Sequence, residues 1–252
     1  MKTMFLTAVA VAATIGMAIA QDDPHLWLEE VEGEAALDWV RSQNDRSLAE
    51  LEGDPRFDDL YQEALSILNS DARLPLGQIH NGHVYNFWQD ETHIRGIWRR
   101  ADVTSYREGD PAWETVLDYD ALAEAEGENW IRGGLACLSP GYRHCMVEVS
   151  HGGKDAGIWR EFDTETKEFI AGGFEIPEAK SSVAWIDKDT LLVGTDWGEG
   201  SLTDSGYARS LRIWRRGEAL SDAAVFYAGD QTDVGMFASV EHDGDDTHLI
   251  AY

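Results

Sequence analysis

Basic residues are scarce in this chain. Its 252 residues include 20 Lys and Arg against 47 Asp and Glu, which gives a formal net charge of −27 at pH 7. A surface this acidic repels nucleic acid and anionic membranes, so the composition excludes both as partners. The acidity is not a sign of disorder, because 10 Trp and 43% hydrophobic residues supply ample core material.

Long apolar runs are also lacking. The one strongly apolar stretch, Met4 to Ile15, is too short to span a bilayer comfortably. Lys2 precedes it and the small residues Ala18-Ile19-Ala20 follow it, which is the pattern of a secretory signal. We therefore predict a signal peptide over residues 1–20, cleaved before Gln21, and an exported mature chain.

Cysteine is almost absent, with only Cys137 and Cys145 in the chain. Two thiols without further ligands nearby make a poor metal or redox site. The residues between them, Ser139-Pro140-Gly141-Tyr142, are typical of a tight turn, which would bring the two cysteines close together across a hairpin. Because thiols oxidise outside the cytoplasm, we predict a structural disulfide between them.

The tripeptide Ile-Trp-Arg occurs three times, centred on Trp98, Trp159 and Trp214. The spacings between these tryptophans are 61 and 55 residues, and each copy follows an apolar run and a loop. Recurrent units of short strands at such spacing are typical of propeller blades. A recurrent aromatic stripe usually belongs to the core, so we expect these tryptophans to pack between blades rather than to bind a ligand.

Each unit opens with a predicted hairpin, and the Asn81-Gly82 turn of the first is the strongest signal. An outer strand follows each complete unit, which makes four antiparallel strands to a blade. We expect a mainly β fold with about three and a half such blades over residues 76–252, the last one ending within a strand. The hairpins of the later units are expected at Leu135–Leu138 with His144–Val149, Val183–Trp185 with Leu191–Val193, and Met236–Val240 with His248–Tyr252.

Helical periodicity marks residues 21–75, which form the predicted N-terminal helical segment. Apolar residues recur at helical spacing from Glu34 to Glu52, and Gly53 is expected to end this helix. Asp54-Pro55 predicts the start of a second helix that ends near Asn69, with Asp as N-cap and Pro at the first helical position. Both helices have apolar faces too large to leave in water without a partner surface.

The mature chain opens with two motifs, Asp23-Pro24-His25-Leu26-Trp27-Leu28-Glu29 and Trp39-Val40-Arg41-Ser42-Gln43-Asn44, and together they resemble the start of the prolyl oligopeptidase family of serine peptidases. Asp23-Pro24-His25-Leu26-Trp27-Leu28-Glu29 matches the family pattern Asp-Pro-x-x-Trp-Leu-Glu. Trp39-Val40-Arg41-Ser42-Gln43-Asn44 matches its second pattern, Trp-Val-x-x-Gln-Asn, at the expected separation. The resemblance extends from Gln21 to Tyr252. The periplasmic bacterial branch of the family fits the predicted signal peptide and a periplasmic or secreted location.

This resemblance implies a two-domain serine endopeptidase that hydrolyses short, proline-containing peptides. In such enzymes a seven-bladed propeller caps an α/β-hydrolase domain that carries a Ser-Asp-His triad. The present sequence contains no Gly-x-Ser-x-Gly elbow, since Ser201 and Ser205 each lack one of the flanking glycines. We therefore assign no catalytic residue, expect the hydrolase domain to be missing, and expect the chain alone to be inactive. The alternative is a non-catalytic, exported, propeller-like binding protein.

Four other segments invite a chemical interpretation, and a structural one is favoured for each. His80 and His83 flank a hairpin tip without a third metal ligand, and Asp243-Gly244-Asp245-Asp246 lacks the late Glu of a calcium loop. Gly198-Glu199-Gly200-Ser201 opens no helix that could cradle a phosphate. Glu124–Glu128 is expected to be a solvated connection between blades. The sequence thus predicts no metal site and no cofactor.

Overall fold

The computed structural model describes residues 23–30, 32–70, 72–244 and 246–252. The chain divides into two compact units, Met1–Leu65 and Ser66–Tyr252, and each is described by itself. The predicted signal peptide lies outside the described residues. Among the residues that are described, no helix is both long enough and apolar enough to cross a membrane.

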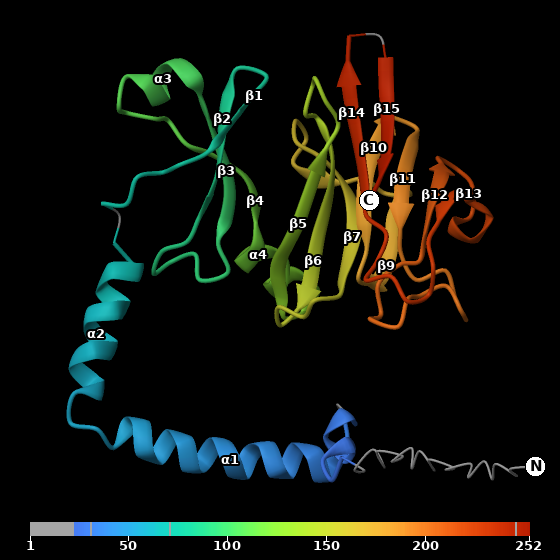
Figure 1. Cartoon of the computed structure of the whole chain (residues 1–252). Helices are drawn as coiled ribbons and strands as arrows, with labels where there is room; N and C mark the ends of the chain where they lie inside the picture. Colours follow the sequence, from blue (N-terminus) through green and yellow to red (C-terminus); the bar gives the residue numbers. More distant parts are fainter. Residues whose placement is uncertain (1–22, 31, 71, 245) are drawn as a thin grey trace, which may run out of the picture. The chain divides into compact units, whose positions relative to one another are not determined.

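The first unit is helical and has little core of its own. It contains η1 (Leu26–Glu29), α1 (Glu34–Glu52) and most of α2 (Phe57–Leu68), which are drawn in blue and cyan in Figure 1. The rings of Trp27 and Trp39 meet edge to face at 6.2 Å between centroids. Among the described residues of this unit only Ala36 is buried. The apolar faces of the helices are therefore exposed within the unit itself.

The bounds of α1 are those that the sequence predicts, whereas α2 begins two residues later than predicted. The Asp54 carboxylate accepts hydrogen bonds from the backbone N–H and the guanidinium of Arg56 instead of capping a helix that starts at Pro55. The backbone N–H of Phe57 bonds to the Asp54 carbonyl at 2.9 Å, which closes a turn ahead of the helix. The predicted N-cap therefore stabilises a turn.

The second unit is built from antiparallel sheets that follow one another along the chain, from green to red in Figure 1. In the first blade the Asn81-Gly82 turn joins the two inner strands, with φ of 44° and 78°. Positive φ at both positions is the geometry of the tightest hairpin turn, which confirms the predicted hairpin. The strands of this blade are β1 (Gln78–His80), β2 (His83–Trp88), β3 (Ile97–Asp102) and β4 (Glu114–Asp118).

The second blade has five strands rather than the four that the sequence predicts. Strand β8 pairs with one end of β7 and β9 pairs with the other end, so two short strands share the outer edge. A register shift between Arg132 and Leu135 marks a bulge at Gly133-Gly134. The strands are β5 (Trp130–Cys137), β6 (His144–His151), β7 (Gly157–Asp163), β8 (Glu168–Phe169) and β9 (Glu175–Ala179).

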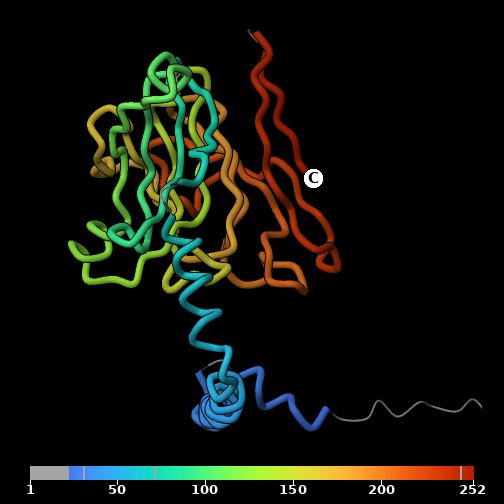
Figure 2. The backbone as a smooth tube through the Cα atoms, turned by 90° about the vertical axis from the view of Figure 1, so that its left-hand side faces the viewer, coloured from blue at the N-terminus to red at the C-terminus, as the bar shows by residue number. Residues whose placement is uncertain are grey.

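A third blade and a two-stranded hairpin complete the described chain. Strand β14 contacts β10 and β11 of the third blade, and the hairpin is the red part of the tube in Figure 2. Three full sheets and one hairpin agree with the predicted three and a half blades. The strands are β10 (Ser182–Asp187), β11 (Thr190–Gly194), β12 (Ser210–Arg215), β13 (Ala224–Ala228), β14 (Ala238–Asp243) and β15 (Asp246–Ala251).

The connection between the first two blades is a helix, α4 (Tyr119–Glu126), and not merely the solvated loop expected from its glutamates. The Asp118 carboxylate caps it by accepting hydrogen bonds from the N–H groups of Asp120 and Ala121. Glu126 accepts a hydrogen bond from the indole of Trp130 and pairs with Arg160 at 2.8 Å. Two further short helices, α3 (Val103–Arg107) and η2 (Leu220–Asp222), are also absent from the sequence prediction.

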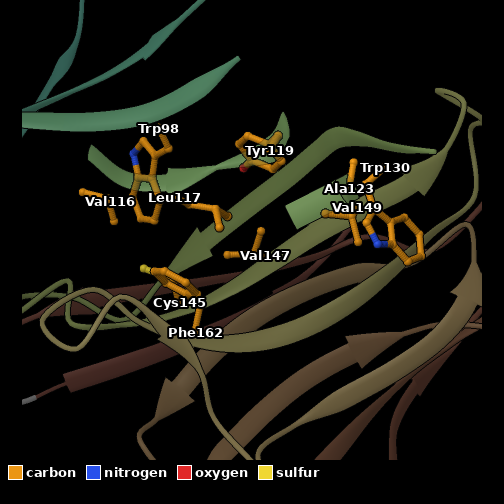
Figure 3. Packing of buried hydrophobic residues seen from close by; sticks show 10 residues of the cluster. All are labelled: Trp98, Val116, Leu117, Tyr119, Ala123, Trp130, Cys145, Val147, Val149 and Phe162. Atoms are coloured by element: carbon orange, nitrogen blue, oxygen red, sulfur yellow. The ribbon is translucent and has the colours of Figure 1, made fainter. Parts of the chain in front are cut away.

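Two hydrophobic clusters fill the space between blades. The first joins β3 and β4 of the first blade and α4 to β6 and β7 of the second, as Figure 3 shows with Trp98 and Phe162. The second cluster lies between the second and third blades and contains Trp159, Trp185 and Trp214. Apolar burial of this kind supplies the main favourable free energy of folding.

The three motif tryptophans are buried, with exposed fractions of 6%, 6% and 7% for Trp98, Trp159 and Trp214. Their predicted core role is therefore confirmed. They do not form one equivalent series, however. Trp98 and Trp159 each join the cluster shared with the following blade, whereas Trp214 contacts Phe174 of the preceding blade at 4.8 Å between ring centroids. The third motif copy thus presents its indole to the opposite side of its sheet.

Candidate functional site

A cavity of about 470 Å³ lies between the first two blades, beside their inner strands. Its walls come from the segment before β1, from β1 to β3, from the start of α4 and from β5 with its following turn. The size falls within the range of roughly 300–1,000 Å³ that is usual for ligand pockets. The lining residues are mostly aromatic or uncharged: Leu76, Gly77, Gln78, His80, Tyr85, Asn86, Phe87, Trp98, Tyr119, Arg132, Leu135, Cys137 and Tyr142.

Arg132 brings a positive charge to this cavity. Its guanidinium carbon lies 4.5 Å from the centroid of the Phe87 ring, a cation–π contact. Phe87 in turn meets the ring of Tyr119 edge to face at 6.1 Å. Burial raises the pKa of the Tyr119 hydroxyl to about 12, and the positive charge of Arg132 opposes this rise. Tyr119 is therefore a neutral hydroxyl group in the neutral pH range.

The hairpin tips of the two blades meet at the cavity. The rings of His80 and Tyr142 stack at 3.9 Å between centroids, and the Asn81 side-chain amide donates to the Gly141 carbonyl at 3.3 Å. Partial burial lowers the pKa of His80, which favours the neutral imidazole. His80 is thus a cavity-wall residue at the hairpin tip. Its neighbour His83 bonds to the Asn81 carbonyl at 3.1 Å.

Cys137 and Cys145 face each other across β5 and β6. They form a registered pair in the ladder, and their sulfur atoms are joined in a disulfide. Cys137 lines the cavity, whereas Cys145 is fully buried in the first cluster. The bond therefore ties a wall of the cavity to the packed interior of the second blade.

A buried ion pair crosses from the second blade to the third. The Glu161 side chain has no exposed surface, and both its oxygens accept hydrogen bonds from the Arg216 guanidinium at 2.7 and 2.9 Å. Glu161 also accepts from the backbone N–H of Phe174 at 2.9 Å. Arg216 further bonds to Asp189 and to the Lys188 carbonyl, and these contacts with the carboxylates raise its pKa. Sequence reasoning missed this pair.

Glu148 occupies a cradle of glycines on the second blade. Its carboxylate accepts a hydrogen bond from the Gly134 N–H at 2.6 Å. A Cβ atom built on Gly133 or on Gly157 would come within 2.6 or 2.5 Å of the Glu148 side chain. Burial raises the pKa of Glu148, while the Gly134 hydrogen bond acts in the opposite direction. The close approach of backbone explains why these positions carry glycine.

The remaining candidate segments take structural roles. Ser201 lies in a loop, where its hydroxyl donates to Asp196 at 3.0 Å and accepts from the Trp197 N–H at 2.8 Å. The Ser205 hydroxyl bonds to the Val234 carbonyl. Asp243 is the last residue of β14 and pairs with Asp246, the first residue of β15. Within the described part of the chain, no cluster of three or more His, Cys, Asp or Glu side chains is arranged to hold a metal ion.

Comparisons with known proteins identify the family of the chain. The family model of the prolyl oligopeptidase N-terminal β-propeller domain matches residues 13–252. The uncharacterized peptidase y4nA of Sinorhizobium fredii is 40% identical over 229 residues, which cover 90% of this chain and 32% of that protein. The uncharacterized peptidase RP174 of Rickettsia prowazekii is 32% identical over 209 residues, covering 80% of this chain and 29% of the relative. The chain thus spans about a third of the length of these relatives.

Solved structures agree on the fold. The post-proline cleaving enzyme of Rickettsia typhi superposes with a TM-score of 0.79 at 26% identity, over 89% of this chain and 38% of that enzyme. Oligopeptidase B of Leishmania major superposes with a TM-score of 0.67 at 13% identity, over 91% of this chain and 31% of that enzyme, and shows the fold alone. The family model, the related peptidases and the sheet topology agree: the chain belongs to the prolyl oligopeptidase family and corresponds to its N-terminal β-propeller region.

Proposed function

We propose that this chain is the gating portion of an exported serine endopeptidase that hydrolyses short, proline-containing peptides. The observation that carries the proposal is the match of its successive antiparallel blades to the post-proline cleaving enzyme of Rickettsia typhi. The family relationship supports peptidase activity for the whole protein. The triad would belong to an α/β-hydrolase domain, since the 252 residues contain no Gly-x-Ser-x-Gly elbow.

The contribution of the propeller would be selection by size. A filter of this kind admits an extended peptide and excludes a folded protein only if its blades do not separate. The contacts between blades fit that requirement, because a buried ion pair joins Glu161 to Arg216 and stacked rings join His80 to Tyr142. The chemistry itself would follow the usual course, in which His activates the Ser hydroxyl and an oxyanion hole stabilises the tetrahedral intermediate.

The proposed location is the periplasm or the exterior of the cell. The signal-like pattern of residues 1–20 supports this location, and so does the pairing of the only two cysteines. Short peptides are the proposed substrates, and the hydrolase domain is the proposed structural partner. Neither nucleic acid nor a membrane is proposed as a partner, because the net charge of −27 opposes both.

A hybrid enzyme tests the gating role. This chain would replace the matching segment of the Rickettsia typhi enzyme, and cleavage of a short proline-containing peptide would be compared with cleavage of a folded protein. We expect the hybrid to cleave the peptide in a manner sensitive to a serine-directed inhibitor and to spare the folded protein. The hydrolase portion without any propeller is the control, and it should lose the size selection.

Two results would contradict the proposal. A folded hybrid that cleaves the peptide and the folded protein at similar rates would show that this propeller does not select by size. Inhibitor-sensitive turnover by the 252-residue chain alone would show that the chemistry resides within it. Peptide binding without turnover in every hybrid would favour the alternative of a non-catalytic binding protein.

A further inference from the structure

The charge of the cavity between the first two blades is opposite to that of the chain. The chain carries 47 Asp and Glu, yet none of the described residues that line the cavity is acidic. Arg132 is the one lining residue with a permanent charge, and burial lowers the pKa of His80, which favours its neutral ring. In so acidic a protein, a cavity with a net positive wall selects for an anionic ligand.

The guanidinium of Arg132 has N–H groups that are free to donate hydrogen bonds to a ligand. Within the described part of the chain it forms no ion pair and no hydrogen bond, and it lies over the face of Phe87. Stacking on a ring holds the plane of a guanidinium while leaving the N–H groups at its edge free to bind a carboxylate. Arg143 of the same blade, by contrast, is already paired with Asp163 and Glu165.

The rest of the wall suits an apolar side chain. Tyr85 lies 5.4 Å from Trp98 between ring centroids, Phe87 packs against Tyr119, and the His80–Tyr142 stack closes the side formed by the hairpin tips. Aromatic walls of this kind bury an apolar group and leave the cation to fix its orientation. The cavity therefore combines one cation with a broad aromatic surface.

We propose that this cavity binds the C-terminal carboxylate of a short peptide whose last residue is apolar. Arg132 receives the carboxylate, and the wall formed by Tyr85 and Phe87 receives the last side chain. This assignment rests on the proposed function, because it supposes that peptides reach the inner strands of the propeller. It adds a subsite that recognises a peptide end.

Calorimetric titration of the 252-residue chain with matched peptides tests the subsite. The probes are N-acetyl-Ala-Phe, its C-terminal amide, and N-acetyl-Glu-Phe amide, whose only carboxylate is on a side chain. A charge-assisted hydrogen bond predicts that the free acid binds at least about tenfold more tightly than its amide. The preference should disappear in Arg132→Gln and persist in part in Arg132→Lys. Arg107→Gln, which changes an exposed arginine outside the cavity, should keep it in full.

Three outcomes would overturn the subsite. They are equal binding of acid and amide, an unchanged preference in a folded Arg132→Gln variant, and binding of the Glu peptide amide as tight as that of the acid. The last outcome would assign the cavity to carboxylates in general. The gating proposal is tested separately, by the size selection of the hybrid enzyme. An intact filter with no acid preference would reject the subsite alone.

Discussion

At the scale of single residues, the carboxylate of Glu148 lies in a place that disfavours its charged form. Glycines at positions 133, 134 and 157 let the backbone approach so closely that the side chain is partly removed from water. One backbone N–H, that of Gly134, compensates for the lost hydration. Burial nevertheless raises the pKa of Glu148 above its ordinary value of 4.5, so the net effect of the site disfavours the charged form.

Glu148→Gln is expected to stabilise the protein at pH 7. Because the pKa is higher in the folded state, the folded protein holds this proton at pH values where the unfolded chain has lost it. Stability from this group is complete below pH 4.5 and is lost as the pH rises through the folded-state pKa. Thermal unfolding should therefore show a higher midpoint for the variant at pH 7 and a smaller difference at pH 4.

The exposed Glu168 of β8 supplies the control. Glu168→Gln should leave the midpoint unchanged at both pH values. A lower midpoint for Glu148→Gln at pH 7 would mean that the carboxylate is stabilised in its charged form, contrary to the burial argument.

At the level of elements, the Asn81-Gly82 turn fixes the register of the first hairpin. Gly82 has φ of 78°, and a Cβ atom built there meets nothing within 4 Å. Gly82→Ala should therefore destabilise the protein through backbone strain alone, by about 1 kcal/mol. Urea denaturation measures this loss. Gly141→Ala is the matched control, because its Cβ also meets open space and its φ is not positive, so no loss is expected.

The strands and the longer helix are predictable because their signals are local. Alternation, an Asn-Gly turn and helical periodicity all act within a few residues, and α1 and the inner hairpins agree with the prediction. Helices α3 and α4 were missed because 5 and 8 residues are too few to show a period. Their one clear sequence signal is the capping aspartate before each, Asp102 and Asp118.

The candidate site was not predictable to the same degree, because its parts are distant in sequence. Arg132 meets Phe87 only when the first two blades pack together, and Glu161 pairs with a residue 55 positions further on. Composition shows only that acidic residues outnumber basic ones, 47 to 20. Which arginine remains unpaired, and in which cavity, depends on the packing of whole blades.

For the propeller unit as a whole, the ion pair of Glu161 and Arg216 holds two blades together. Arg216→Gln would leave the fully buried Glu161 carboxylate without its positive partner. This loss should lower the free energy of unfolding by about 3 kcal/mol. Urea denaturation of the variant checks this value. The double variant with Glu161→Gln should recover part of the loss, because no buried charge remains.

Arg107→Gln, on an exposed helix surface, should unfold at the wild-type urea concentration. If Arg216→Gln also unfolds there, the ion pair contributes nothing to the cohesion of the blades. A double variant less stable than Arg216→Gln would likewise contradict the argument from an uncompensated charge.

The opposite facing of Trp214 has a consequence for how this propeller can be taken apart. Three identical tripeptides suggest interchangeable modules, yet the third projects its indole toward the preceding sheet and the second toward the following one. Two of the three motif indoles therefore lie between the second and third blades, whereas the junction with the cavity receives one. Exchanging the second and third blades would overpack one junction between blades with indole rings and leave a cavity at another. The tripeptide is repeated in the sequence, but each copy packs in a way that suits only its own blade.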